Sequence, residues 1–177
     1  MNEAPLRSHE HGLLPEGDGW YVVNVAEAQW RSNPAFGDWF NFEGDVRFEG
    51  FGLNVHVLQP GQPACMYHRE NAQEGFLVLS GVCRAVVEGQ ERRLRAWDYL
   101  HCPEGTDHVL VGGDEGPSVV LMIGARKPDQ RCVYPVDAAA GRYGASVSVE
   151  TPDPKQAYAE TPPSEDVPAR WPSDGDA

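Results

Sequence analysis

Between residues 45 and 127 the chain alternates short hydrophobic runs with pairs of turn-forming residues. We expect strands over seven of these runs, namely Gly52–Leu58, Phe76–Leu79, Val82–Val87, Gln90–Arg95, Asp98–Cys102, His108–Val111 and Ser118–Ile123. Turn signals such as Pro60-Gly61, Ser80-Gly81 and Glu104-Gly105 separate them. Short strands at this spacing are typical of an all-β sandwich or barrel, not of alternating β and α units.

Two of the expected strands are hydrophobic at consecutive positions rather than at every second one. Phe76–Leu79 and Val119–Ile123 present apolar side chains to both faces of a sheet, which is typical of strands that are covered on both sides. We therefore expect one face to line the barrel interior and the other to pack against another sheet or subunit.

An aromatic segment precedes the barrel. The pattern predicts a strand over Trp20–Val25 and a short helix over Ala26–Arg31 that ends near Asn33-Pro34. Residues 1–44 are expected to form an N-terminal arm that covers a sheet, either as an edge strand of the same subunit or across a dimer.

A C-terminal extension follows the barrel. Short helices are expected at Pro135–Ala140 and Pro154–Ala159, before a Pro-rich stretch that includes Thr161–Pro168. That stretch is expected to be disordered or to wrap the surface. Residues 128–177 thus form an extension that is partly helical and has a flexible acidic end.

Charge narrows the range of partners. The 177 residues include 27 Asp and Glu against 14 Lys and Arg, a formal net charge of −13. Binding to nucleic acid or to anionic membranes needs a basic surface, so neither is expected. The longest hydrophobic runs are too short to span a bilayer, and Met1–Gly19 has no signal-peptide character. The four cysteines show no CxxC pair, so we expect reduced thiols in a cytoplasmic protein.

Four side chains carry the most informative pattern: His68, Glu70, Glu74 and His108. His68 and Glu70 point to the same side of an extended segment, because side chains alternate along a strand. Glu74 precedes the hydrophobic run Phe76–Leu79, where a carboxylate is costly to bury unless it is paired or binds a cation. Imidazoles and carboxylates together suit Zn, Fe, Mn or Ni, and two histidines with one carboxylate form an open iron site. Each residue alone is compatible with an ordinary hydrogen-bonded role, so the hypothesis depends on the combination.

These positions resemble the two motifs of the cupin superfamily. The first motif is, in outline, Gly, five residues, His-x-His, three or four residues, Glu, six residues and Gly. The matching positions here are Gly61, His68, Glu70, Glu74 and Gly81. The second motif, with its Pro-x-Gly-x-x-His core, matches at Pro103, Gly105 and His108. The resemblance covers about residues 50–125.

Three positions depart from the family pattern, and one extra residue precedes His68. Glu70 stands where a second His is usual, Trp97 where the second motif has its first Gly, and Gly112 where that motif has Asn. Two registers follow. In the first, Glu70 is a metal ligand; in the second, a bulge moves His68 into the second His position and Met66 into the first, and Glu70 leaves the metal. Both registers keep His68, Glu74 and His108.

The resemblance implies a double-stranded β-helix, a jelly-roll barrel, over residues 45–127. It also implies a divalent transition metal (Zn, Fe, Mn or Ni) held by His68, Glu70, Glu74 and His108, and frequently a homodimer whose N-terminal arms exchange strands.

The function expected from such a site is that of a small-molecule metalloenzyme, for example a dioxygenase or an isomerase. The alternative is a non-catalytic module that binds or senses a small molecule or a metal. A storage protein fits a short acidic chain poorly. No catalytic acid or base is assigned, since His101 is compatible both with the barrel mouth and with the outside of the barrel.

Overall fold

The computed structural model describes residues 1–171, which form mostly antiparallel strands. The elements are β1 (Leu6–His9), β2 (Gly12–Pro15), a 3-10 turn (Val25–Glu27), β3 (Gln29–Asn33), β4 (Gly37–Asn41), β5 (Phe51–Leu58), β6 (Arg69–Glu70), β7 (Glu74–Ser80), β8 (Val82–Val87), β9 (Gln90–Arg95), β10 (Tyr99–Cys102), β11 (His108–Gly112), β12 (Ser118–Ala125), β13 (Cys132–Val133), α1 (Ala138–Gly141), α2 (Pro154–Ala157) and β14 (Glu165–Pro168). Strands β5 and β7 to β12 correspond to the seven strands that the hydrophobic pattern predicts.

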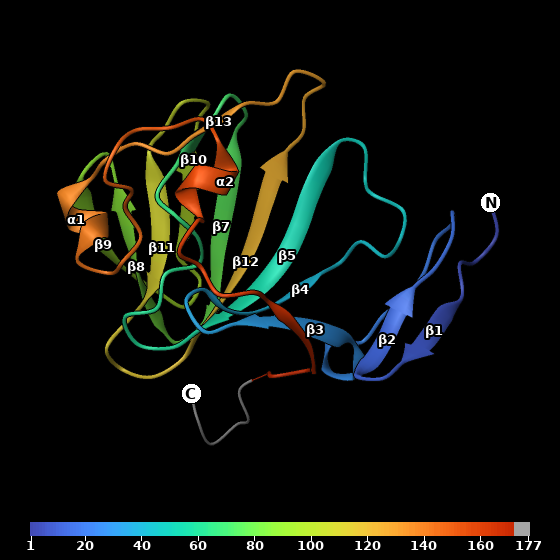
Figure 1. The fold of residues 1–177 in the computed structure, drawn as a ribbon. Coiled ribbons are helices and arrows are strands. Elements are labelled where there is room, and N and C mark those ends of the chain that lie inside the picture. Colours follow the sequence, from blue (N-terminus) through green and yellow to red (C-terminus); the bar gives the residue numbers. More distant parts are fainter. Residues whose placement is uncertain (172–177) are drawn as a thin grey trace.

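Two sheets form the walls of a barrel (Figure 1). One has seven strands in the order β10-β7-β12-β5-β4-β3-β14, and the other has three in the order β11-β8-β9. A hydrophobic core lies between them, with Val78 and Val120 from the larger sheet packed with Cys83 and Leu110 from the smaller. The fold is therefore an all-β jelly-roll barrel, a double-stranded β-helix, as the resemblance implies.

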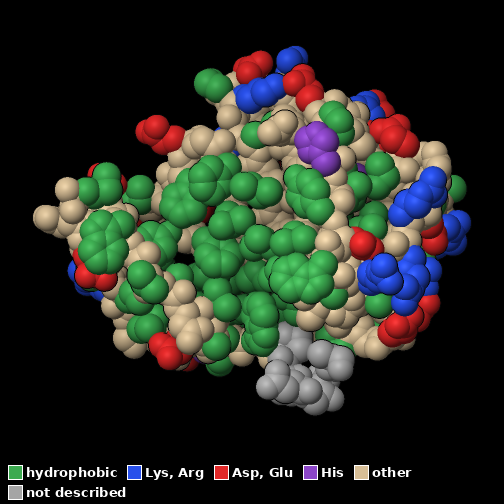
Figure 2. Space-filling view, turned by 180° about the vertical axis from the view of Figure 1, so that it is seen from behind, with side chains coloured by type: hydrophobic (Ala, Val, Ile, Leu, Met, Phe, Trp, Pro, Cys, Tyr) green, Lys and Arg blue, Asp and Glu red, His purple; other side chains and the backbone are tan. Residues whose placement is uncertain are grey.

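The larger sheet is hydrophobic on its outer face as well. On β12, Val120 and Met122 point into the barrel core, whereas Val119 and Leu121 belong to a separate cluster with Trp30 and other residues outside. Figure 2 shows hydrophobic side chains gathered over this face, seen from behind the view of Figure 1. The two-sided hydrophobic pattern of these strands is thus explained by two layers of packing, one on each side of the sheet.

The expected helix over Ala26–Arg31 is wrong. Only Val25–Glu27 is helical, as a 3-10 turn, and β3 begins at Gln29. The reason is tertiary: Trp30 is fully buried in the outer cluster, and its indole N–H donates to the Val25 carbonyl oxygen at 2.7 Å. Pairing of β3 with β4 and β14 then provides hydrogen bonds for the backbone N–H and C=O groups that would otherwise have been paired within a helix.

The strand expected over Trp20–Val25 is also absent, and only Trp20 forms an isolated bridge, with Glu3. Strands β1 and β2 instead make a hairpin that extends away from the barrel at the right of Figure 1. The larger sheet includes strands from both sides of residue 44, where the expected arm ends, since Phe40 of β4 lies opposite Val55 of β5.

The C-terminal extension returns to the barrel. Its two short helices are capped by the side chains of Asp137 and Asp153, which accept hydrogen bonds from backbone amides. The stretch Thr161–Pro168 wraps the surface, because β14 pairs with β3. The last part of the expected flexible acidic end, residues 172–177, lies outside the described residues. Within residues 1–171, no helix is long and hydrophobic enough to cross a membrane.

Candidate metal centre

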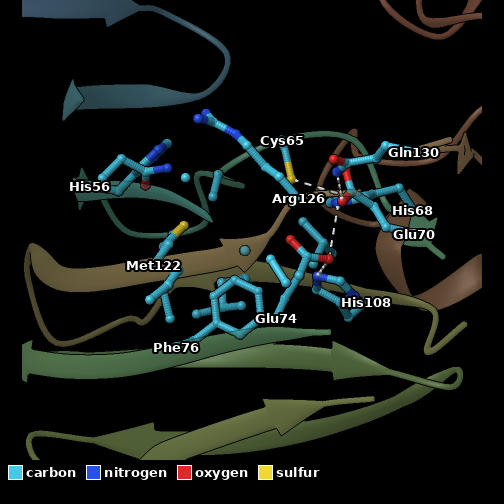
Figure 3. A pocket seen from close by; sticks show the side chains of 18 of the residues that line it. His56, Cys65, His68, Glu70, Glu74, Phe76, His108, Met122, Arg126 and Gln130 are labelled. Carbon is cyan, nitrogen blue, oxygen red and sulfur yellow. Dashed lines mark hydrogen bonds and ion pairs between the residues drawn. The ribbon is translucent and has the colours of Figure 1, made fainter. Parts of the chain in front are cut away.

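His68, Glu74 and His108 come together at one end of the barrel interior (Figure 3), where one ligand atom from each lies within 4.8 Å of the others. Glu74 begins β7 and His108 begins β11, so the two sheets each supply one residue. His68 lies just before β6 and is held beside His108 by a pair of backbone hydrogen bonds, of 3.1 and 2.8 Å. The glutamate Oε2 lies 3.3 Å from Nε2 of His108 and 3.8 Å from Nε2 of His68.

The backbone sets the tautomer of both imidazoles. Nδ1 of His68 lies 2.9 Å from the carbonyl oxygen of Met66, and Nδ1 of His108 lies 3.0 Å from that of Thr106. A carbonyl oxygen only accepts hydrogen bonds, so each Nδ1 carries the proton and each Nε2 presents a lone pair. Both lone pairs face the carboxylate of Glu74, and Nε2 of His108 is buried with no hydrogen-bond partner among the described residues.

This grouping places three electron-pair donors close together, and no positively charged group lies among the three to stabilise them. Burial raises the pKa of Glu74 to about 8, with a further contribution from the negative charge of Glu70. Burial lowers the pKa of His108 to about 4 and also lowers the pKa of His68. A divalent cation removes the conflict, because it favours the carboxylate over the acid and accepts both nitrogen lone pairs. The residues present therefore fit a transition metal, and three protein ligands leave coordination positions open.

Glu70 lies in a different group of side chains. Its carboxylate, Nε2 or Nδ1 of His68 and the thiol of Cys132 lie within 4.8 Å of one another, and it accepts a hydrogen bond of 2.5 Å from the side-chain amide of Gln130. Glu70 and Glu74 are not brought into one three-residue group. Ligation of the same metal by Glu70 stays a prediction. Met66, the alternative first-motif position, is buried in a cluster with Phe36 and other residues.

The sequence alone does not place Cys132 and Cys65 at the site and indicates only that they are reduced thiols. Cys132 lies on β13 directly opposite Glu70 on β6, and Sγ of Cys65 lies 3.6 Å from Nδ1 of His68. Burial raises the pKa of Cys132 to about 11 and raises that of Cys65 as well. The spacing of Cys132 carries no signal, because it reaches the site only when the C-terminal extension folds back. His101 is exposed on β10, outside the barrel.

The metal group opens onto a cavity of about 280 Å³ inside the barrel. His56 and Met122 line the wall that faces the metal group across the cavity (Figure 3). Arg47 and Arg126 line it as well. A small molecule bound here would reach the open coordination positions of a metal at His68, Glu74 and His108.

Two departures from the family motifs have a structural explanation. Trp97, at the usual position of a glycine, has φ 74°, the left-handed backbone conformation that favours glycine, and its side chain is exposed. Gly112, at the usual position of Asn, lies so close to Gln59 that an added Cβ would be 2.0 Å from its carbonyl oxygen. At position 97 the backbone conformation that favours glycine is kept although the residue is Trp. At position 112 there is no room for a side chain such as that of Asn.

Comparison with known proteins identifies a domain in the central part of the chain. A family model described as the cupin domain matches residues 54–124, a range that contains His68, Glu74 and His108. No curated protein matches the chain significantly.

Several solved structures are similar to part of the chain. A structure named a putative sugar phosphate isomerase, from Acidithiobacillus ferrooxidans, is 23% identical with a TM-score of 0.44, over 48% of this chain and 55% of the other. A sugar phosphate isomerase from Silicibacter pomeroyi is 24% identical with a TM-score of 0.46, over 52% and 65%. A DMSP lyase from Ruegeria pomeroyi is 19% identical with a TM-score of 0.45, over 53% and 49%. The chain thus spans less than two thirds of the length of each. The sequence motifs, the jelly-roll barrel and the family model agree that this chain contains a cupin domain over residues 54–124.

Proposed function

We propose that this protein is a metal-dependent enzyme that acts on a small molecule. The observation that supports this most directly is the position of His68, Glu74 and His108. These residues form an open set of ligands at the end of an internal cavity rather than a closed structural site. A structural metal would be enclosed by four protein ligands, whereas a metal with open positions next to a cavity can contact a bound molecule.

His68, Glu74 and His108 would hold the metal, with Zn, Fe, Mn and Ni as the candidates. When bound, such a metal polarises a substrate oxygen or activates water or dioxygen. The protein's own contribution is to fix both imidazoles by their Nδ1–H bonds, to bury His108 and to half-bury His68, which limits the access of water to these ligands. Both a dioxygenase and an isomerase are compatible with this arrangement, because the fold does not select the reaction.

A first experiment tests the metal. The protein is purified without added metal and analysed for Zn, Fe, Mn and Ni. We expect close to one divalent ion per chain. A protein that contains none and takes up none from solutions of these ions would contradict the proposal.

A second experiment separates an enzyme from the alternative, a binding or sensing module. The metal-loaded protein is incubated with small-molecule pools, while dioxygen uptake and the proton NMR spectrum are followed. Turnover with dioxygen uptake identifies an oxygenase, and turnover without it identifies an isomerase or related enzyme. Saturable binding with no turnover in any pool would favour the non-catalytic module.

We also propose that the protein forms a homodimer through the outer face of the larger sheet. Tyr99 and Ile123 lie on this face and are 61% and 41% exposed. Figure 2 shows hydrophobic side chains gathered over the same face. Exposed hydrophobic surface of this kind is typical of an interface. Light scattering is expected to give a dimer at micromolar concentration and a monomer for the double variant Tyr99→Glu and Ile123→Glu. A wild-type monomer would contradict the proposal.

We propose a cytoplasmic location as well, since the thiols of Cys65 and Cys132 lie beside the metal group and are free. A reducing compartment keeps such thiols reduced. Cell fractionation with a tagged full-length chain tests this, and recovery in an extracytoplasmic fraction would contradict it.

A further inference from the structure

The cavity has a second polar end that the metal group does not account for. Asn54 and His56 lie on β5 opposite Met122 and Val120 of β12, and both line the cavity. His56 is only 8% exposed. The Oδ1 atom of Asn54 and the Nδ1 atom of His56 are buried without a hydrogen-bond partner in the part of the chain that the structure describes. Figure 3 shows His56 across the cavity from Glu74 and His108.

Buried polar atoms are almost always paired, because an unpaired one loses its hydrogen bonds to water without replacement. The side chains of Asn54 and His56 both line the cavity, so a molecule bound there can come within hydrogen-bond reach of both of them. Unpaired groups in such a position are what a ligand-binding pocket presents before its ligand arrives.

The orientation of His56 is fixed before any ligand binds. Its ring stacks on the indole of Trp39, with centroids 5.7 Å apart and planes 13° from parallel. Burial lowers the pKa of His56 to about 4, so the ring is neutral at pH 7 and has one N–H and one lone pair. The amide oxygen of Asn54 accepts a hydrogen bond. A hydroxyl group, which both donates and accepts, is complementary to this pair.

Two arginines, Arg47 and Arg126, line the cavity together with the carboxylates of Glu70 and Glu74. Arg126 pairs with Glu43, with Nη2 of Arg126 2.8 Å from Oε2 of Glu43. Arg47 lines the same cavity and forms no ion pair with any residue in 1–171. Arg126 forms the contact ion pair with Glu43, while Arg47 acts on Glu43 only through a weaker Coulombic attraction, so the guanidinium of Arg47 remains open to an anion. In a chain with a net charge of −13, an available guanidinium beside a cavity selects for a small anion.

We propose that Asn54, His56 and Arg47 form the substrate-binding subsite, and that the substrate is a small anion that carries a hydroxyl group. Asn54 and His56 hydrogen-bond the hydroxyl, and Arg47 binds the anionic group at the rim. The cavity of about 280 Å³ limits the substrate to a small metabolite. This assignment rests on the proposed function, since it places the substrate within reach of the same metal group. A carboxylate and a phosphate share the chemistry that Arg47 recognises, so the experiment includes both.

The test is isothermal titration calorimetry on the metal-loaded protein with four probes. L-Lactate and glycerol 3-phosphate carry an anionic group and a hydroxyl group, while lactamide and glycerol are their neutral counterparts. We expect at least one of the two anions to bind at least tenfold more tightly than its neutral counterpart. His56→Phe and Asn54→Leu should each weaken that binding at least tenfold, and Arg47→Met at least fivefold, without change in metal content.

Matched controls separate the subsite from general effects. His101→Phe removes an exposed histidine on β10, and Arg95→Met removes an exposed arginine on β9; both should bind as the wild type does. His56→Gln, which keeps a polar side chain, replaces His56→Phe if the latter does not fold. The proposal is overturned if neither anion binds, if neutral and anionic probes bind alike, or if the subsite variants bind as the controls do.

The same titrations, repeated on the protein without added metal, distinguish this proposal from the proposed function. A protein that holds its metal and binds no anion overturns the subsite alone. Anion binding that depends on His56 in a protein that takes up no metal supports the subsite and overturns the metal-dependent function.

Discussion

The two ends of the barrel cavity are built in different ways. At one end, His68, Glu74 and His108 bring their lone pairs close together, and the backbone fixes the tautomer of both histidines. At the other end, Asn54 and His56 leave polar atoms unpaired, and a stacked indole holds the imidazole. The first end is complementary to a cation and the second to a hydroxyl group. Burial alone therefore does not determine the role of a histidine in this cavity. The residues around His108 make it suited to a metal cation, and the residues around His56 make it suited to a hydroxyl group.

The sharpest test of this contrast is the loss of metal from His108→Ala. We expect metal content to fall to background, because the variant removes a buried nitrogen that has no hydrogen-bond partner within residues 1–171. The loss should exceed the roughly 10–100-fold typical of residues that only support a ligand. His56→Phe is the matched comparison at the other end, and elemental analysis should find its metal content unchanged. Equal losses in the two variants would show that both ends belong to one metal site.

The acid sensitivity of the metal-free protein should depend on His56. Its pKa in the folded protein, about 4, is below the ordinary value of 6.5, so folding favours the neutral ring. The stabilisation is complete above pH 6.5 and is lost as the pH falls towards 4. At 1.36 kcal/mol per pH unit, this interval corresponds to about 3 kcal/mol in the free energy of unfolding.

Urea unfolding of the metal-free protein between pH 7 and 4 measures this effect. His56→Phe should flatten the pH dependence by up to that amount, and His101→Phe should leave it unchanged. If His56→Phe and the wild type lose stability in parallel, then His56 is not the buried neutral histidine that the structure indicates.

Glu70→Gln separates the two motif registers. If Glu70 binds the metal directly, the variant should weaken metal retention as much as Glu74→Gln does. Because the Glu70 carboxylate lies with Cys132 and accepts a hydrogen bond from Gln130, we expect the smaller loss, about 10–100-fold at most. Competition with a chelator gives both affinities, and an equal loss in the two variants would establish the first register.

The smallest effect is expected for Cys132→Ser. Burial raises the pKa of this thiol to about 11, so it is neutral at pH 7, and the thiolate is the form that binds metals. Metal affinity should change by less than about tenfold, below the range for residues that support a ligand. A loss comparable to that of His108→Ala would instead place the metal among His68, Glu70 and Cys132.

The sequence predicted the barrel well because its strands carry their own signals. Paired turn residues delimit β5 and β7 to β12. The continuous hydrophobic positions of β7 and β12 predicted packing on both faces of the larger sheet. The arm was predicted poorly. Residues 26–31 have a helical pattern by themselves, but Trp30 is better buried on the outer face of the sheet, where β14 supplies a pairing partner from the far end of the chain.

The sequence by itself determined the barrel and three of the four predicted metal-site residues that the structure brings together, His68, Glu74 and His108. The strands follow from local spacing, since strand alternation and tight turns act over a few residues, and the grouping of the three residues is what the resemblance to the two cupin motifs implies. Only the tertiary structure decided that Glu70 faces Cys132 across β6 and β13, and that Asn54 and His56 stand unpaired opposite the metal group. Contacts between residues far apart in the chain depend on how sheets and extensions pack. Whether a buried polar atom lacks a hydrogen-bond partner cannot be predicted from the order of the residues.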